Sequence, residues 1–187
     1  MSLRPALFLD RDGVINVDTN FLYKWEECVF IDGIVPLIAT ANRLNMPVIV
    51  ITNQSGIGRG LYTEDDFHLL MRHMSAGLLE QGARLDAIYF SPFHPKHGIG
   101  HYQQDTDCRK PAPGMLLRAA AEHGIDLGRS FLVGDRCSDL RAGFNAGVPH
   151  RYLFGNTELL PCPDDVPYTY ANTLFQVQQH IEASVSL

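Results

Sequence analysis

Short runs of apolar residues alternate along this chain with stretches in which apolar side chains recur every three or four positions. The short runs are typical of buried strands and the periodic stretches are typical of helices. Strands are expected over residues 6–9, 48–51, 85–90, 130–133 and 150–154, and helices over 35–44, 63–81, 114–123, 139–146 and 173–183. This alternation predicts an α/β fold, a doubly wound parallel sheet with helices on both faces.

The segments between these elements set limits on the architecture. Residues 52–60 read as a glycine-rich loop, residues 91–108 as a long polar loop, and the stretch after residue 155 as a proline-rich tail. The stretches 16–36 and 55–86 are too short, or too regularly helical, to hold a separate cap domain. We therefore expect one domain over residues 1–187, with an open site.

Composition and charge narrow the classes of function. The chain has 187 residues and a net charge of −6, so it lacks the broad basic surface of a nucleic-acid-binding protein. No apolar run approaches the roughly 20 residues of a membrane span, and the first residues do not resemble a signal peptide. The cysteines form no CxxC pair; they are Cys28, Cys108, Cys137 and Cys162. We expect a cytoplasmic monomer with reduced thiols, which binds neither nucleic acid nor a membrane.

Polar side chains that could take part in catalysis or in ligand binding follow three of the predicted strands. Asp10 and Asp12 come directly after the first strand, Thr52 after the second and Asp135 after the fourth. In open parallel sheets, ligands bind beyond the carboxyl ends of the strands. The sequence therefore predicts that these side chains meet in one site.

The segment Asp-Arg-Asp-Gly at residues 10–13 places two carboxylates two positions apart, and Gly13 permits a bend there. One carboxylate can attack phosphorus, while the other protonates the leaving alkoxide and later deprotonates water. With Asp10, Asp135 can hold one Mg²⁺, which prefers oxygen ligands. The alternative interpretation is an acidic turn, with Asp135 in a Gly-Asp turn and Asp139 as a helix N-cap.

Basic and glycine-rich segments supply further candidates. Lys110 can neutralise Asp10 and stabilise the phosphoryl oxygens, and the planar fork of Arg109 suits a second phosphate or a sugar hydroxyl. The loop over residues 52–60 offers backbone N–H groups that can cradle phosphate, although the Walker pattern is absent. Taken alone, a basic pair before proline is more often a solvated turn.

Four motifs occur in order with strands between them: DxDG at Asp10, the strand-end Thr52, Lys110 before proline, and GDxxxD at residues 134–139. This set resembles the haloacid dehalogenase-like phosphatases. The segments FLDRDGVIN, FIDG, TNQSGIGRG and DCRKPAPGM resemble, more narrowly, the D-glycero-D-manno-heptose-1,7-bisphosphate 7-phosphatases. The related histidinol-phosphate phosphatases share much of the pattern.

The resemblance implies a Rossmann-type fold and Mg²⁺-dependent phosphomonoester hydrolysis through an aspartyl-phosphate. It implies that Asp10 is the nucleophile, that Asp12 is the acid/base, and that Thr52 and Lys110 steady the phosphoryl group. The metal would be held by Asp10, Asp135 and the backbone carbonyl of Asp12. The implied substrate contacts are Asp18, Phe21, Asn53, Gln54, Ser55, Arg109 and Arg136.

This sequence departs from the family pattern around the substrate. Arg136 stands where the heptose family usually has lysine, and residues 18–21 read Asp-Thr-Asn-Phe without the usual glycine and tyrosine. Both departures lie where the family contacts its substrate.

A larger departure concerns zinc, which these families typically hold with a Cys-x-His and a Cys-x-Cys pair. The first pair reads Ser91-Pro92-Phe93 here and the second Thr106-Asp107-Cys108, so one of the four ligands remains. A rebuilt site from His94, His97, His101 and Cys108 is the alternative. We expect no zinc, and a loop ordered by its prolines and by Phe93 and Tyr102 beside Arg109.

Three functions follow from these features. The leading one is removal of the 7-phosphate of D-glycero-D-manno-heptose 1,7-bisphosphate, a step of carbohydrate metabolism that the resemblance places in lipopolysaccharide biosynthesis. The rival activity is that of a histidinol-phosphate phosphatase or of another small sugar-phosphate phosphatase. Additional acidic residues in the pocket would favour histidinol phosphate, because that substrate carries a cationic amine. A catalytically silent binding module is the third, but it has no need for the combined motif set.

Overall fold

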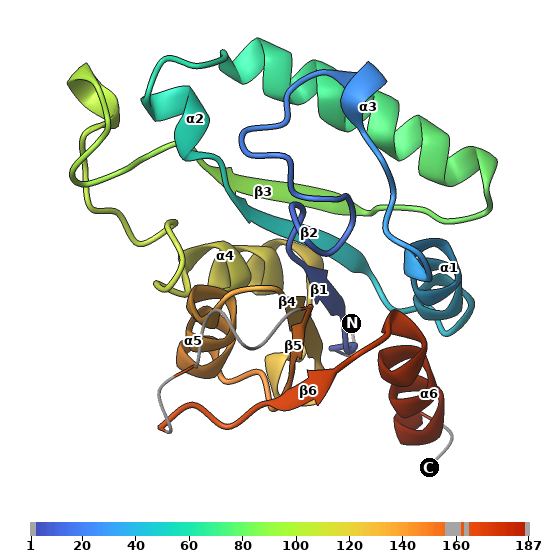
Figure 1. Cartoon of the computed structure of the whole chain (residues 1–187). Coiled ribbons are helices and arrows are strands. Elements are labelled where there is room, and N and C mark those ends of the chain that lie inside the picture. Colours follow the sequence, from blue (N-terminus) through green and yellow to red (C-terminus); the bar gives the residue numbers. More distant parts are fainter. Residues whose placement is uncertain (1–2, 156–161, 163–164, 186–187) are drawn as a thin grey trace.

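The fold is built on a six-stranded sheet, shown in Figure 1 for the computed structural model, which describes residues 3–155, 162 and 165–185. The strands are β1 (Leu7–Leu9), β2 (Val48–Asn53), β3 (Ala87–Ser91), β4 (Phe131–Gly134), β5 (His150–Phe154) and β6 (Thr169–Ala171). All neighbours are parallel, in the order β3-β2-β1-β4-β5-β6. The predicted doubly wound parallel sheet is thereby confirmed.

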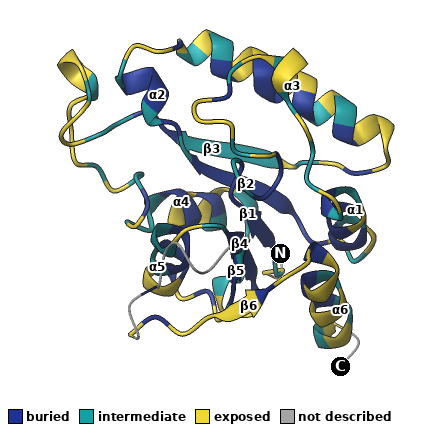
Figure 2. Ribbon diagram, in the orientation of Figure 1, coloured by how far each residue is buried: buried dark blue, intermediate teal, exposed yellow. Residues whose placement is uncertain are grey.

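Helices cover both faces of the sheet, as Figure 2 shows. On one face lie α1 (Ile34–Arg43), α3 (Glu64–Glu80) and α6 (Leu174–Val185), and on the other α4 (Gly114–His123) and α5 (Cys137–Ala146). Leu7 and Leu9 of β1 join the first core and Phe8 joins the second, so the whole strand is buried. Among the described residues, no helix is long and apolar enough to cross a membrane.

Three elements differ from the prediction. The short helix α2 (Ser55–Gly58) lies inside the segment expected to be a loop, and β6 lies in the tail where no strand was expected. β6 is an edge strand with two exposed residues of three, so it lacks an apolar run. The helix α5 begins before Asp139, because the Asp139 carboxylate accepts a hydrogen bond from the Arg136 N–H at 3.0 Å.

The loop over residues 91–108 is ordered largely by its own contacts. It contains the 3₁₀ turn η2 (Gly100–Tyr102), and the rings of Phe93 and Tyr102 meet with centroids 6.0 Å apart. Arg109 Nη1 donates to the Phe93 carbonyl at 2.9 Å. The expected position of this loop beside Arg109 is therefore confirmed. Two further 3₁₀ turns are η1 (Trp25–Glu27) and η3 (Leu127–Arg129).

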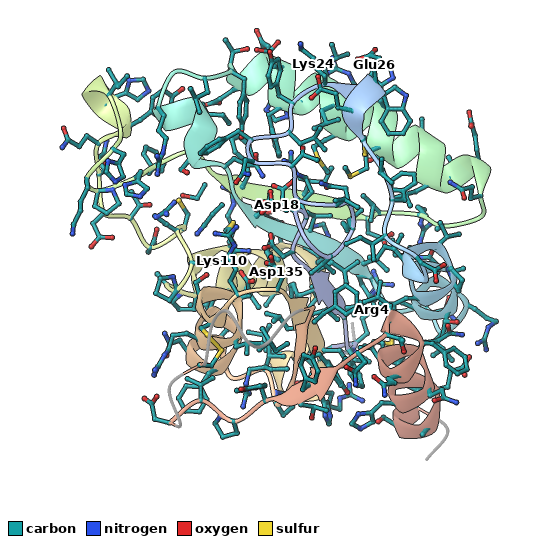
Figure 3. All side chains as sticks on the ribbon, in the orientation of Figure 1. Arg4, Asp18, Lys24, Glu26, Lys110 and Asp135 are labelled. Carbon is teal, nitrogen blue, oxygen red and sulfur yellow. A yellow bond between two sulfur atoms is a disulfide. The ribbon has the colours of Figure 1, made fainter. Side chains whose placement is uncertain are left out.

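The expectation of four reduced cysteines is wrong. Cys137 and Cys162 form a disulfide, visible as a yellow bond in Figure 3, while Cys28 and Cys108 are free. The two bonded residues are 25 positions apart, and the fold brings their Cα atoms to 5.1 Å. Because this proximity arises from tertiary packing, the spacing of cysteines along the sequence carried no sign of it.

Candidate active site

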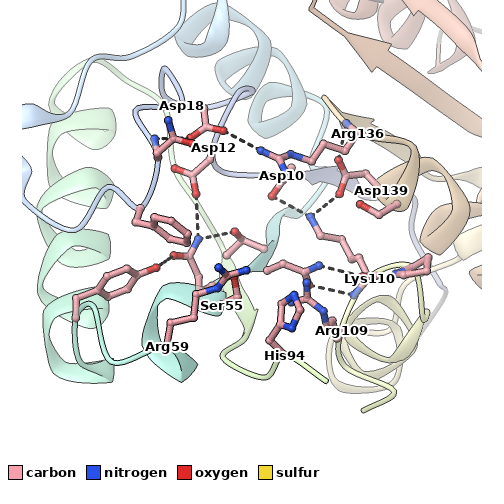
Figure 4. A pocket seen from close by; sticks show the side chains of 18 residues that line it. Asp10, Asp12, Asp18, Ser55, Arg59, His94, Arg109, Lys110, Arg136 and Asp139 are labelled. Atoms are coloured by element: carbon pink, nitrogen blue, oxygen red, sulfur yellow. Dashed lines mark hydrogen bonds and ion pairs between the residues drawn. The ribbon is translucent and has the colours of Figure 1, made fainter. Parts of the chain in front are cut away.

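The site lies where the winding of the sheet reverses. The central strand β1 has β2 on one side and β4 on the other, and ligands of such sheets bind at this switch point. A pocket of about 510 Å³ opens there, seen in Figure 4. Of the expected site residues, Asp10, Asp12, Asp18, Phe21, Thr52, Asn53, Gln54, Ser55, Arg109, Lys110 and Arg136 line it. Asp10, Asp12 and Thr52 meet in the pocket as predicted, whereas Asp135 does not line it and instead lies with a carboxylate oxygen within 4.8 Å of one of Asp10.

Lys110 links the two sides of the switch point. Its Nζ lies 2.9 Å from Asp10 Oδ1 and 2.7 Å from Asp139 Oδ1, and it donates to the Ile51 carbonyl at 2.8 Å. The residue is 3% exposed. Burial favours the neutral amine, but the two carboxylates outweigh burial and raise the pKa of Lys110 above its ordinary value. The ammonium therefore offsets part of the negative charge around Asp10.

Three carboxylates gather at this point. One oxygen each from Asp10, Asp135 and Asp139 lies within 4.8 Å of the others, and Asp135 Oδ1 is buried with no hydrogen-bond partner among the described residues. Burial is the main cause that raises the pKa of Asp10 to about 7 and that of Asp135 to about 8, with mutual repulsion adding to it. A buried carboxylate set of this kind, with the Asp135 oxygen still unpaired among the described residues, fits a hard divalent cation.

Gly13 allows Asp135 to approach the bend after β1. Its φ is +82°, and a Cβ at this position would lie 2.3 Å from Asp135 Oδ2. Another residue would both strain the backbone and push the carboxylate away. The bend expected at Gly13 is confirmed, and its closeness to Asp135 explains why glycine is required.

Asp12 is held by several donors. Arg11 Nη2 lies 2.7 Å from both carboxylate oxygens, and Asn16 donates to Oδ1 at 3.0 Å. Gln54 Nε2 donates to Oδ2 at 3.1 Å. The Asp12 side chain keeps 21% exposure toward solvent, and it lines the pocket, so it is both fixed and accessible.

Two residues that were expected to contact the substrate have side-chain amides that form hydrogen bonds with other residues of the protein. The Asn53 side chain donates to the Lys110 carbonyl and accepts from the Lys110 N–H, both at 3.0 Å. Gln54 is 1% exposed and bonds Asp12, Thr52 and Tyr62. Asn53 thereby fixes the Lys110 backbone, and Gln54 faces the Asp12 carboxylate.

The mouth of the pocket carries the other expected substrate residues. Arg136 Nη2 donates to Asp18 Oδ2 at 3.0 Å, and Figure 3 labels Asp18 above Asp135. Phe21 adopts a left-handed backbone with φ of 63°, and the guanidinium of Arg59 lies 5.5 Å from its ring centroid. The structure therefore brings Asp18, Phe21 and Arg136 to the same opening.

Sequence reasoning missed Arg59 and His94 as pocket residues. His94 Nδ1 accepts from the N–H groups of Lys96 and His97 at 3.1 and 3.0 Å, so the neutral ring carries its proton on Nε2. Burial, followed by the charge of Arg109, lowers the pKa of His94. Burial and the charge of Arg59 likewise lower the pKa of Arg109. Arg59 lies within TNQSGIGRG, so its segment was noticed but not its side chain.

The candidate zinc ligands are engaged elsewhere. Cys108 Sγ lies 3.2 Å from Thr106 Oγ1 and donates to Ser91 Oγ at 3.4 Å, so hydroxyls surround the remaining thiol. His101 packs on Tyr102 with ring centroids 3.9 Å apart. Within the described ranges, no group of three metal-ligating side chains includes these histidines or Cys108. The residues do not fit a tetrahedral zinc.

Comparisons with known proteins agree with this geometry. A family model described as "HAD-hyrolase-like" matches residues 107–151. The D-glycero-alpha-D-manno-heptose-1,7-bisphosphate 7-phosphatase of Burkholderia mallei is 49% identical over 160 residues, 86% of this chain and 81% of that protein. The D-glycero-beta-D-manno-heptose-1,7-bisphosphate 7-phosphatase of Vibrio cholerae is 42% identical over 150 residues, 80% of this chain and 81% of that protein.

A solved structure shares the fold over nearly its whole length. The D,D-heptose 1.7-bisphosphate phosphatase from B. bronchiseptica, complexed with magnesium and phosphate, has a TM-score of 0.82 and 29% identity, covering 98% of this chain and 99% of that one. The chain therefore belongs to the haloacid dehalogenase-like phosphatases, in the family of the heptose-1,7-bisphosphate 7-phosphatases, and is a phosphoric monoester hydrolase.

Proposed function

We propose that this enzyme removes the 7-phosphate of D-glycero-D-manno-heptose 1,7-bisphosphate in a Mg²⁺-dependent reaction through an aspartyl-phosphate on Asp10. The observation that carries the proposal is the pairing of Asp10 with Lys110 at 2.9 Å, at the bottom of a pocket whose outer part is basic. The names of the relatives, which act on this bisphosphate, support the choice of substrate.

Asp10, Asp135 and the backbone carbonyl of Asp12 would hold the Mg²⁺. The buried Asp135 Oδ1, which has no hydrogen-bond partner among the described residues, supports this assignment, as does the magnesium in the B. bronchiseptica relative. When bound, the ion offsets the repulsion between carboxylates and the phosphate dianion and orients the phosphate.

The protein groups divide the chemistry between two steps. Asp10 Oδ attacks phosphorus, and the bond from phosphorus to the sugar oxygen breaks as Asp12 gives that oxygen a proton. Asp12 then takes a proton from water as the water oxygen attacks phosphorus, which frees Asp10 and releases inorganic phosphate. Lys110 and Thr52 stabilise the charge on the phosphoryl oxygens.

The outer pocket favours a substrate with a second anion. Arg59, Arg109 and the Nε2–H of His94 lie on one side of the pocket, where burial, followed by nearby charges that include Arg109 and Arg59, lowers the pKa of His94. The carboxylates of Asp18 and Asp12 are paired with arginines. Among the described residues, the pocket carboxylates outside the Asp10–Asp139 cluster are therefore already paired and are not free to bind an ammonium group. This argues against histidinol phosphate.

Turnover with both anomers of heptose 1,7-bisphosphate, with histidinol phosphate and with a heptose 7-monophosphate tests the proposal. We expect the bisphosphate to have the highest kcat/KM. Arg109→Met should raise KM for the bisphosphate by about tenfold or more, because a charged hydrogen bond contributes about 1.5–3 kcal/mol. The same variant should leave KM for the monophosphate nearly unchanged. A preference for histidinol phosphate would reject the assigned substrate.

A further inference from the structure

The carboxylate of Asp12 accepts hydrogen bonds from two buried side chains, Arg11 and Gln54. Arg11, its neighbour in sequence, is 0% exposed and reaches around it, with Nη2 at 2.7 Å from both oxygens and Nε at 3.1 Å from Oδ1. Gln54 Nε2 approaches Oδ2 from the other side at 3.1 Å. Figure 4 draws this bond as a dashed line from the carboxylate of Asp12.

Arg11 is itself held rigidly. Its Nη2 donates to the Leu22 carbonyl at 3.0 Å, and its Cζ lies 5.8 Å from the ring centroid of Phe67 on α3. Its Nη1 is buried and has no hydrogen-bond partner in the described part of the chain. Buried ion pairs with unsatisfied groups are often no more stable than apolar replacements, so stability alone gives little reason for an arginine here.

The side-chain amide of Gln54 is oriented by hydrogen bonds with Tyr62 and Thr52. Its Oε1 accepts from the Tyr62 hydroxyl at 2.5 Å, and its Nε2 also donates to Thr52 Oγ1 at 2.8 Å. Because the phenol donates to Oε1, the amide must turn its N–H groups toward Asp12. Burial raises the pKa of Tyr62 to about 12, which keeps the hydroxyl protonated.

The ring of Tyr62 fits only because residue 56 is glycine. A Cβ on Gly56 would lie 2.2 Å from Tyr62 Cε1. The ring also stacks on Tyr23, with centroids 5.5 Å apart. Packing against Gly56 and Tyr23 therefore holds the Tyr62 ring with its hydroxyl at Gln54.

We propose that Arg11 and Gln54, the latter oriented by Tyr62, are positioning residues that hold the Asp12 carboxylate at the angle required for proton transfer. Arg11 is fully buried, and Gln54, although it borders the pocket, uses its side-chain amide on Asp12, Thr52 and Tyr62. The inference rests on the proposed function, because it takes Asp12 as the general acid and base.

Tyr62→Phe tests the positioning with the smallest change, because it removes one hydroxyl and keeps the ring. Tyr23→Phe is its matched control, since it removes the hydroxyl of the stacked neighbour, which no described contact links to Asp12. We expect Tyr62→Phe and Gln54→Met to lower kcat for a sugar phosphate by about 10- to 100-fold, with KM unchanged, because misplacement of a catalytic group has effects of this order. Arg11→Lys, which keeps the charge and loses the fork, should lower kcat in the same way, with KM unchanged.

The dependence on the leaving group separates positioning from a structural effect. Para-nitrophenyl phosphate releases a stable phenolate and needs little help from an acid, whereas hydrolysis of the phosphoenzyme still needs a base. With this substrate, Tyr62→Phe should keep the fast burst of phenolate and slow the steady-state rate that follows. A structural defect would reduce the amplitude of the burst instead, and that result would overturn the proposal.

A double-mutant cycle tests whether these residues act through Asp12. In an Asp12→Asn background, Gln54→Met and Tyr62→Phe should cause no further loss in kcat. Fully additive losses, or a raised KM with normal kcat, would reject the positioning role. If Asp10→Asn turns over as fast as the unmodified enzyme, the proposed function itself is rejected, and this inference falls with it.

Discussion

At the scale of single residues, the site concentrates charges in a small buried volume. Lys110 lies between Asp10 and Asp139, and Arg11 grips Asp12. These pairings were only partly visible in the sequence. The motifs identified Asp10, Asp12 and Lys110, but the partners of Gln54 and Asn53 depend on side-chain directions that a linear pattern does not contain. Both amides were therefore expected at the substrate and are found on protein groups.

Replacement of Asp12 by asparagine should lower kcat about 10²–10⁴-fold, the usual contribution of general acid and base catalysis. The amide keeps the size of the side chain but cannot carry the proton to the leaving oxygen. Stopped-flow and steady-state rates on the same substrate would measure the loss in each step. Near-normal turnover of the variant would refute the role given to Asp12.

Mg²⁺ should bind more tightly as the pH rises from about 6 to above 8. Without metal, burial raises the pKa of Asp10 to about 7 and of Asp135 to about 8, so both carboxyls retain protons at low pH and must lose them to bind the ion. Affinity should fall about tenfold per pH unit for each proton displaced, and it should level off above the higher pKa. Calorimetry in buffers of different ionisation enthalpy would count these protons. Affinity that is independent of pH, with no proton release, would contradict the expectation.

At the scale of elements, the sequence predicted the strands and helices that carry strong periodicity. It missed β6 and α2, because an exposed three-residue edge strand and a single glycine-containing turn have no apolar period. It also missed the link between Cys137 on α5 and Cys162, which depends on tertiary packing.

The loop over residues 91–108 should carry no zinc. The hydroxyls of Ser91 and Thr106 lie beside the Cys108 thiol, and neutral hydroxyls are poor replacements for thiolate ligands. Elemental analysis of protein purified without chelators or a metal-affinity tag should find far less than one zinc per chain. One equivalent of zinc, lost together with structure in a Cys108→Ser, His94→Ala variant, would contradict this.

Reduction of the Cys137–Cys162 disulfide should destabilise the fold by about 2–4 kcal/mol, because the crosslink restricts the unfolded chain. Urea unfolding with and without a dithiol reductant would measure the difference. In Cys162→Ser, which has no such bond, the reductant should have no effect. Equal stability of the unmodified protein in both conditions would show that the bond does not contribute.

At the scale of the whole molecule, the doubly wound sheet creates the site. Asp10, Thr52 and Asp135 follow different strands, and the parallel order β2-β1-β4 places their ends side by side. This much could be predicted, because strand polarity alone fixes which edge the side chains share. The basic outer pocket could not be predicted in full, since Arg59 and His94 reach it from two separate loops. A single domain and a monomeric state stay predictions.

The most direct test of the central claim is to trap the phosphoryl group on Asp10. The enzyme would be mixed with Mg²⁺ and heptose 1,7-bisphosphate, quenched in acid within the first turnover, and treated with borohydride, which reduces an acyl-phosphate to an alcohol. Mass spectrometry of the proteolytic peptide that contains Asp10 should then find homoserine at that position, and none when Mg²⁺ is omitted. Rapid phosphate release with an unmodified Asp10 at every quench time would contradict the account.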